Sequence, residues 1–262
     1  MTAFLEGGCI VRDMKEGVPL LRGTVAVWSQ ITRKTGAQSI SLHVLEFAPG
    51  LSPGLANHDC DQVLYFLEQL DRGTQSPDQV TFYIDGRSFE VAPRTGIYIR
   101  PNQTFAVENR SPSPIHFVST QCPESLDGVK FVEPILAPAN EAVSVQSPPI
   151  VSLADRRSIP TGDRWYRVLV DASVGSKMVT QFVGAIPPGR APDHFHEYEE
   201  VLFILQGEGR MWAGTSHTPI GPGSCVYLPT RQVHCVENTG EQELRLLGVF
   251  YPAGSPSVRY DA

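Results

Sequence analysis

The sequence is short of positive charge and contains no long apolar run. Its 21 Lys and Arg against 28 Asp and Glu give a net charge of -7, so we expect no nucleic-acid partner, because phosphate binding requires a basic surface. No apolar run approaches the length of a membrane span. The first residues, MTAFLEGGCIVRDMKEG, lack the basic start and apolar core of a signal peptide. These features predict a cytoplasmic protein without a membrane partner.

Cysteine is scarce too. The five cysteines are odd in number and scattered, and no two of them form a CxxC pair. Disulfide frameworks and zinc knuckles use paired, closely spaced cysteines. We therefore expect reduced thiols that pack as small buried apolar side chains. They are Cys9, Cys60, Cys122, Cys225 and Cys235.

A convincing long amphipathic helix is also missing from the pattern. In its place, 23 Gly and 22 Pro punctuate the chain, which is typical of many short strands joined by turns. The length of 262 residues, 41 % of them hydrophobic, suits two domains of ordinary size or one large β-barrel. The composition therefore favours an all-β fold.

An internal repeat divides the chain. Residues 39–67 read SISLHVLEFAPGLSPGLANHDCDQVLYFL, and residues 177–205 read KMVTQFVGAIPPGRAPDHFHEYEEVLFIL. Each copy is an apolar strand, a Pro-Gly turn, a polar loop and a second apolar strand, and each continues through a glycine hairpin to a strand that ends in VEN. The repeat predicts two β domains of similar plan, residues 1–145 and 146–262.

Two segments have no counterpart in this repeat. Residues 134–160 contain PILAPAN and QSPPIV, and we expect an ordered linker that crosses from one domain to the other. The insert EQLDRGTQSPDQ, residues 68–79, occurs in the first copy alone. We expect it to form a surface loop.

The second copy contains metal-binding residue types at a regular spacing. His194 and His196 are two residues apart, so on a strand both point to one side. Glu200 re-enters on the neighbouring strand after a tight connection, and His234 comes from a later strand. This mixed nitrogen and oxygen set suits Mn²⁺, Fe²⁺, Ni²⁺, Co²⁺ or Zn²⁺, and occasionally Cu²⁺. On an octahedral ion, four ligands leave two open positions, the usual mark of a catalytic site.

The same residues form a pattern that resembles the two characteristic motifs of the cupin superfamily. The resemblance implies a bicupin, in which two tandem cupin barrels (double-stranded β-helices, or jelly rolls) follow each other. It also implies that the C-terminal barrel binds one divalent transition metal. A single departure, four residues in place of five between the first glycine and the first histidine, is expected to alter a loop and not the ligands. The pattern is Gly189-x4-His194-x-His196-x3-Glu200-x6-Gly207, then Gly223-x5-Pro229-x4-His234-x3-Asn238.

The first copy has lost these ligands. One histidine and one glutamine cannot hold a divalent ion tightly, so we expect a degenerate metal site in the N-terminal barrel. That barrel would then serve packing, dimerisation or a second small ligand. Alignment of DQVLYFL with EEVLFIL places Ala56, His58 and Gln62 where the second copy has His194, His196 and Glu200, and Phe105 or Ala106 where it has His234.

Further side chains near the motif are candidates for substrate contacts and catalysis. Glu200 can remain a ligand or move to accept a proton. Arg190, just before the histidine pair, can meet a carboxylate or phenolate, while Tyr198 and Tyr227 are candidate substrate contacts. The alternatives are a solvated loop arginine and packed aromatic side chains.

The ligand set indicates where a reaction would take place, but it does not determine which reaction that is. The cupin resemblance implies a metal-dependent enzyme that acts on a small organic molecule, with a quercetinase-like dioxygenase as the first hypothesis. One alternative is a non-oxidative enzyme, namely a ureidoglycine aminohydrolase-like hydrolase, a decarboxylase or an isomerase. Another is a non-catalytic protein that binds a small ligand. Cupin barrels commonly dimerise through exposed strand edges, so a homo-oligomer, in the simplest case a homodimer, is expected.

Overall fold

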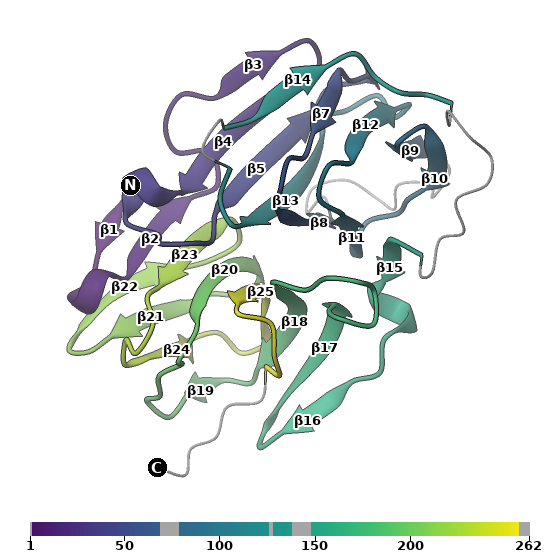
Figure 1. Ribbon diagram of the computed structural model, residues 1–262. Coiled ribbons are helices and arrows are strands. Elements are labelled where there is room, and N and C mark those ends of the chain that lie inside the picture. The colour runs from purple at the N-terminus through teal and green to yellow at the C-terminus, as the bar shows by residue number, and fades with distance from the viewer. Residues whose placement is uncertain (1, 69–78, 126–127, 138–147, 257–262) are drawn as a thin grey trace.

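The computed structural model describes residues 2–68, 79–125, 128–137 and 148–256. Their regular structure is almost all strand (Figure 1), which confirms the expected all-β fold. The described helices are short 3₁₀ turns at Glu6–Gly8, Arg33–Thr35 and Leu153–Asp155. None has the length and apolarity that crossing a membrane would need.

The first barrel consists of two facing sheets. One has the strand order β15-β11-β8-β13-β5-β4-β3, and the other has the order β10-β9-β12-β7-β14 with β6 paired to β12. Their bounds are β3 Leu20–Arg22, β4 Val25–Ile31, β5 Leu42–Phe47, β6 Gly50–Leu51, β7 Gly54–Ala56, β8 Asp61–Phe66, β9 Val80–Ile84, β10 Arg87–Glu90, β11 Thr95–Ile99, β12 Thr104–Asn109, β13 Ile115–Cys122, β14 Lys130–Val132 and β15 Ile150–Ser152.

The second barrel repeats this plan. Its sheets have the orders β1-β2-β23-β20-β25-β18-β17-β16 and β19-β24-β21-β22, so two tandem barrels are confirmed. Their bounds are β1 Ala3–Phe4, β2 Ile10–Asp13, β16 Ile159–Thr161, β17 Arg164–Val170, β18 Thr180–Ile186, β19 Gly189–Arg190, β20 Glu199–Gln206, β21 Gly209–Ala213, β22 Ser216–Ile220, β23 Ser224–Leu228, β24 His234–Asn238 and β25 Leu244–Tyr251.

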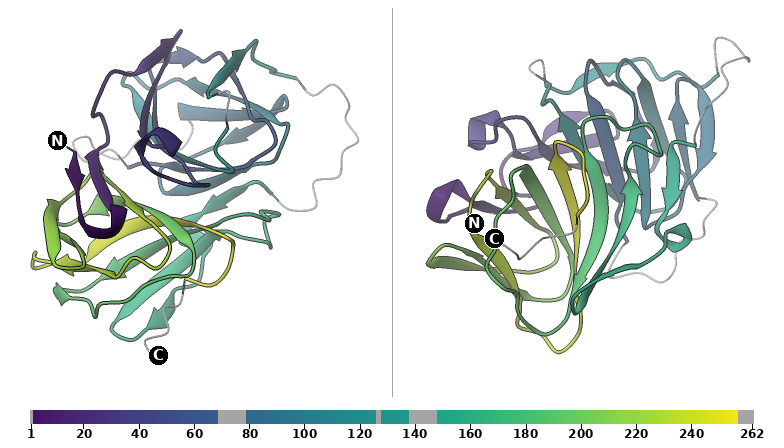
Figure 2. Two further views of the ribbon diagram at one scale, coloured as in Figure 1. Left: turned by 60° about the vertical axis from the view of Figure 1, so that its left-hand side comes forward. Right: turned by 60° about the horizontal axis from the view of Figure 1, so that its bottom comes forward.

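Each barrel is completed by a strand from the other half of the chain. The N-terminal strand β2 pairs with β23 of the second barrel, and β15, which follows the first repeat, pairs with β11 of the first barrel. Figure 2 shows the purple N-terminal strands against the yellow-green strands of the second barrel. Part of the expected linker, residues 138–147, and most of the expected insert, residues 69–78, lie outside the described residues.

The large sheets of the two barrels pack face to face. Their buried cluster combines Val63 and Tyr65 of the first barrel with Val201 and Phe203 of the second. Each barrel also has an interior core of its own. The five cysteines are buried and free, as the sequence predicts.

Two carboxylates form hydrogen bonds that connect one barrel to the other. Asp61, the first residue of β8, accepts hydrogen bonds from the backbone amides of Lys177 and Met178, both at 2.7 Å, and from the Tyr98 hydroxyl at 2.7 Å. Asp61 is 3 % exposed. Because Lys177 and Met178 precede β18 of the other barrel, Asp61 fixes where that strand begins.

Glu199, the first residue of β20, does the same in the opposite direction. Its carboxylate accepts the backbone amides of Gln38 at 2.5 Å and Ser39 at 2.9 Å, just before β5, and the Tyr227 hydroxyl at 2.6 Å. We call Asp61 and Glu199, with the backbone amides they bind, the carboxylate clamps. Charge-assisted hydrogen bonds of this kind are roughly twice as strong as neutral ones.

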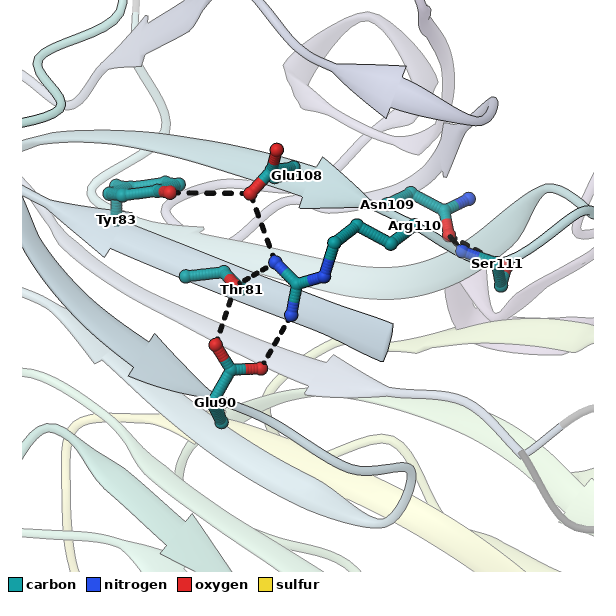
Figure 3. Close-up of polar contacts among 7 residues, drawn as sticks. All are labelled: Thr81, Tyr83, Glu90, Glu108, Asn109, Arg110 and Ser111. Carbon is teal, nitrogen blue, oxygen red and sulfur yellow. Dashed lines mark hydrogen bonds and ion pairs between the residues drawn. The ribbon is translucent and has the colours of Figure 1, made fainter. Parts of the chain in front are cut away.

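The repeated VEN tripeptide also has a structural explanation. Asn109 donates from Nδ2 to the carbonyls of Phe47 at 3.0 Å and Ser113 at 2.8 Å, and its Oδ1 accepts the Ser111 amide (Figure 3). Asn238 makes the equivalent bonds to the carbonyls of Ile186 and Gln242 and to the amide of Gly240. In both barrels, one buried asparagine therefore satisfies backbone groups of the loop that follows it.

Figure 3 also shows an ion-pair network around Arg110 on the outer face of the first barrel. Arg110 Nη2 lies 2.9 Å from Glu90 Oε2, and Nη1 lies 3.0 Å from Glu108 Oε2. The side chains of Arg110 and Glu90 are 40 % and 53 % exposed. Exposed pairs contribute little to stability because water screens them, so this network does not organise the fold.

Replacing Asp61 with Ala tests the clamp. The change removes the acceptor of two partly buried amides and of the buried Tyr98 hydroxyl, so we expect the free energy of unfolding to fall by about 2–4 kcal/mol. Urea unfolding of D61A measures this loss. The control is D59A, because Asp59 is exposed two residues away. Equal stability of the two variants would contradict a stabilising clamp.

Candidate metal centre

Two backbone hydrogen bonds bring the first and last predicted ligands together. The His194 amide donates to the His234 carbonyl at 3.0 Å, and the His234 amide donates to the His194 carbonyl at 2.8 Å. His234 opens β24, whereas His194 forms this single antiparallel bridge outside any longer strand. Phe195, between the two predicted histidines, is 46 % exposed. The chain is therefore extended here, with alternating side chains.

The three predicted histidine ligands converge inside the second barrel. One ring nitrogen from each of His194, His196 and His234 lies within 4.8 Å of the others. The ring centroids are 4.5 Å apart for His194 and His234, 4.9 Å for His194 and His196, and 5.0 Å for His196 and His234. This spacing allows all three rings to bind one ion.

Glu200 lies beside this triad. It is the second residue of β20, 4 % exposed, and its Oε2 is 3.5 Å from His196 Nε2. Neighbouring residues of a strand point to opposite faces, so Glu200 enters the barrel while Glu199 joins its carboxylate clamp in the interface. The carboxylate is thus close to one member of the triad.

The hydrogen bonds of the rings suit metal binding. His194 Nδ1 lies 3.0 Å from the Pro192 carbonyl, and His234 Nδ1 lies 2.7 Å from the Gln232 carbonyl. A carbonyl can only accept, so each Nδ1 carries the proton and each Nε2 carries its lone pair. Backbone carbonyls orient metal-binding histidines in the same way in known sites. The residues therefore fit a divalent ion.

Burial sets the charges of these groups. It lowers the pKa of His196 to about 3, with help from the neighbouring His234 and His194, and that of His234 to about 4. Burial also lowers the pKa of His194 and raises that of Glu200 to about 8. At neutral pH without metal, the histidines are therefore neutral and Glu200 holds a proton.

A small cavity of about 100 Å³ opens onto the triad. Its walls are mainly apolar, with Phe182, Leu202 and Leu246 among them. Among the described lining residues, Arg164 is the one cation other than histidine. Its side chain is 15 % exposed, and it is close enough to His194 to oppose protonation of that ring. The Nε of Arg164 lies 3.5 Å from the exposed Asp163 carboxylate, so the cavity combines a nitrogen-rich floor with one cation that is ion-paired through its Nε.

The other predicted contact residues have different positions. Tyr198 lines the cavity and stacks between His196, 4.4 Å away, and Phe250, 4.2 Å away, measured between centroids. Arg190 lies over the Trp212 ring at 4.2 Å and pairs with Asp193; it does not line the cavity. Tyr227 is in the interface between the barrels, bound to Glu199.

Two residues that contribute to the site or to its support were not predicted from the sequence pattern. Arg164 is thirty positions before His194 and lines the cavity as the first residue of β17, where it pairs with Thr161 of β16; nothing in the motif marks this distant position. Glu199 does have a local signal. The pair Glu199-Glu200 opens an alternating strand, which places one carboxylate on each face. The sequence interpretation placed Glu199 in the preceding connection instead.

The equivalent region of the first barrel is filled differently. Gln62 donates to the Ser119 hydroxyl at 2.9 Å, and Phe105 stacks on Phe82 with centroids 5.2 Å apart. Within the described ranges, the triad of the second barrel is the one histidine, cysteine or acidic cluster whose geometry suits a metal.

Comparison with known proteins agrees with this geometry. Residues 182–250 match the family model described as a cupin domain. Auxin-binding protein T92 of Nicotiana tabacum is 36 % identical over 87 residues, which cover 29 % of this chain and 46 % of that protein. The oxalate-binding protein of Thermotoga maritima is 36 % identical over 66 residues, 24 % of this chain and 54 % of that protein. The matched segments thus span about half the length of these relatives.

The structural likeness extends over both barrels. Oxalate decarboxylase from Bacillus subtilis superposes with a TM-score of 0.73, covering 94 % of this chain and 77 % of that one at 15 % identity. At such low identity the likeness shows the fold alone. The chain thus has the two-barrel fold of a bicupin, and its second barrel contains the segment that matches the cupin domain.

Proposed function

We propose that this bicupin is a metal-dependent enzyme that decarboxylates a small carboxylate. Its ion is held by His194, His196, His234 and Glu200. One observation carries the choice of substrate: Arg164 shares a cavity of about 100 Å³ with the triad. A guanidinium is the group best suited to hold a carboxylate, through two parallel hydrogen bonds.

The size of the cavity argues against a large substrate. Sites for drug-sized molecules have volumes of about 300–1,000 Å³, well above the 100 Å³ of this cavity. A flavonol, the substrate of the quercetinase-like reaction expected from the ligand set, would not fit without rearrangement. A compact carboxylate fits the volume and meets the charge of Arg164.

The protein side chains have separable tasks in this reaction. Arg164 holds the substrate carboxylate, and the apolar walls exclude water, which strengthens the electrostatic interactions within the cavity. The ion would act as a Lewis acid towards a substrate oxygen. The bond between the departing carboxylate and its neighbouring carbon breaks, the electron pair stays on that carbon, and a proton replaces carbon dioxide. Tyr198, which lines the cavity and stacks on His196, delivers that proton; burial raises its pKa, so its hydroxyl is protonated at neutral pH.

The relatives support a carboxylate ligand. One solved structure with the same fold is an oxalate decarboxylase, and one sequence relative is an oxalate-binding protein. The dioxygenase remains the alternative, because four ligands leave open positions where oxygen can bind. A binding protein without turnover is the third hypothesis. The cytoplasmic location and the homodimer remain predictions.

The metal assignment is tested by His234→Ala. Removing one of the three imidazoles leaves too few nitrogen ligands, so purified H234A is expected to lose most of its metal while the parent chain holds about one ion. Elemental analysis measures the metal. The control H217A removes an exposed histidine on β22 and is expected to keep the ion. A full metal complement in H234A would refute the site.

Metal binding is also expected to release a proton. Glu200, with its pKa raised to about 8, must ionise to become a ligand, whereas the histidines are already neutral. Release is therefore about 0.9 proton per ion at pH 7 and falls towards zero above pH ~9, and affinity rises with pH until about pH 8. Calorimetry in buffers of different ionisation enthalpy measures the release. The control E200Q should release none; release that grows with pH would contradict the assignment.

The reaction is tested with two- to six-carbon carboxylates, oxalate included, under strict anaerobiosis. We expect carbon dioxide to form without oxygen, and Arg164→Ala to raise KM by about 100-fold, because a charge-assisted pair is lost. Arg164→Lys should recover part of the loss. The control R210A removes an arginine whose ion pair with Glu237 is exposed. Turnover of flavonols that requires oxygen would favour the dioxygenase instead.

A further inference from the structure

A second and larger cavity lies between the barrels. It has a volume of about 490 Å³, within the range of small-molecule sites. On β20, Glu200 and Leu202 line the metal cavity, whereas Phe203 and Leu205 line this one, and Trp165 of β17 borders both cavities. We call it the inter-barrel cleft.

The cleft has matching walls from the two repeats. The alignment of DQVLYFL with EEVLFIL pairs Tyr65 with Phe203 and Leu67 with Leu205, and all four line the cleft. Tyr65 and Phe203 also belong to one buried cluster. Two aromatic rings, one from each barrel, thus give the cleft an apolar, aromatic lining.

One wall residue is held in a conformation that suits glycine. Arg94, just before β11, has a φ of 67°, and Gly223, just before the equivalent strand β23, has a φ of 90°. Both residues line the cleft. Only glycine adopts this left-handed conformation without strain, and a strained residue that persists often has a functional side chain. The first repeat thus keeps an arginine where glycine would be less strained.

The charge of the cleft favours an anion. Arg94 hydrogen-bonds to Tyr65, and Arg245, from the other barrel, is also close enough to counteract the burial that raises the pKa of Tyr65. Arg245 Nε is buried without a hydrogen-bond partner among the described residues. The third cation, Lys15, pairs with Glu46 at 2.6 Å.

Glu46 is fully engaged in the same wall. Its Oε2 also lies 2.9 Å from Nε2 of His116, whose pKa burial lowers, so that His116 is a neutral neighbour. Glu68 is the remaining carboxylate of the described lining. Three cations and two carboxylates line the cleft, although the chain carries a net charge of -7, and Arg245 Nη2 also pairs at 3.3 Å with Glu243, which lies outside the lining.

We propose that the inter-barrel cleft binds a flat, apolar small molecule with one anionic group, such as an aromatic carboxylate or sulfonate. Tyr65 and Phe203 contact the flat body, and Arg94 and Arg245 contact the anion. The site is independent of the metal and of the proposed reaction, because none of these four side chains lines the metal cavity.

The test uses two fluorescent probes on the full chain. The anionic probe is 8-anilino-1-naphthalenesulfonate, and the uncharged probe of similar shape is N-phenyl-1-naphthylamine. The parent chain is expected to bind the anionic probe more tightly. Arg94→Gly introduces the residue that the second repeat has at this position. It should lower the affinity for the anionic probe by about tenfold or more, because a charge-assisted contact is lost. The affinity for the uncharged probe should stay unchanged.

Stability separates a ligand-binding arginine from a structural one. R94G removes the strain at φ 67°, so its Tm is expected to equal or exceed that of the parent chain. Arg245→Gln should also lower the affinity for the anionic probe, whereas R22A, at an exposed arginine of β3, should leave that affinity unchanged. Absence of anionic-probe binding by the parent chain, equal binding by R94G, or a lower Tm of R94G with unchanged binding would each overturn the proposal.

Discussion

The architecture depends on the way β20 divides two adjacent carboxylates between its faces. Glu199 points into the interface between the barrels, where it accepts the amides of Gln38 and Ser39. Glu200 points into the second barrel, beside His196. Because one backbone holds both, the contact that fixes one barrel against the other also fixes a proposed metal ligand. Asp61 of the first barrel makes the corresponding contact, with the backbone amide of Lys177 in the second barrel. The residue after it is Gln62, at the position that Glu200 has in the second copy.

Burial has opposite effects in the two barrels. In the second, it surrounds three imidazoles with apolar walls, lowers the pKa of His196 to about 3 and raises that of Glu200 to about 8. This site can bind a divalent ion without first deprotonating a histidine. In the first, stacked Phe82 and Phe105 fill the interior. The same fold therefore supports a polar centre in one copy and a hydrophobic core in the other.

The sequence predicts what depends on local spacing. The motif around His194, His196 and Glu200 brings its histidines together as expected, because strand alternation and a short connection suffice to aim them. The repeat likewise predicts two barrels. The pairing of β2 with β23 and of β15 with β11 has no local signal, because the residues of a strand do not show which distant strand it will pair with. Arg164 escapes prediction for the same reason, and the candidate Tyr227 lies in the interface because β23 turns it towards Glu199.

The proposed ion in the second barrel is the central claim, and anomalous diffraction from crystals grown with Mn²⁺ or Zn²⁺ tests it most directly. The account predicts one strong peak about 2.0–2.3 Å from the Nε2 atoms of His194, His196 and His234 and from a carboxylate oxygen of Glu200. A peak held by other side chains, a peak inside the first barrel, or an empty triad at saturating metal would contradict it.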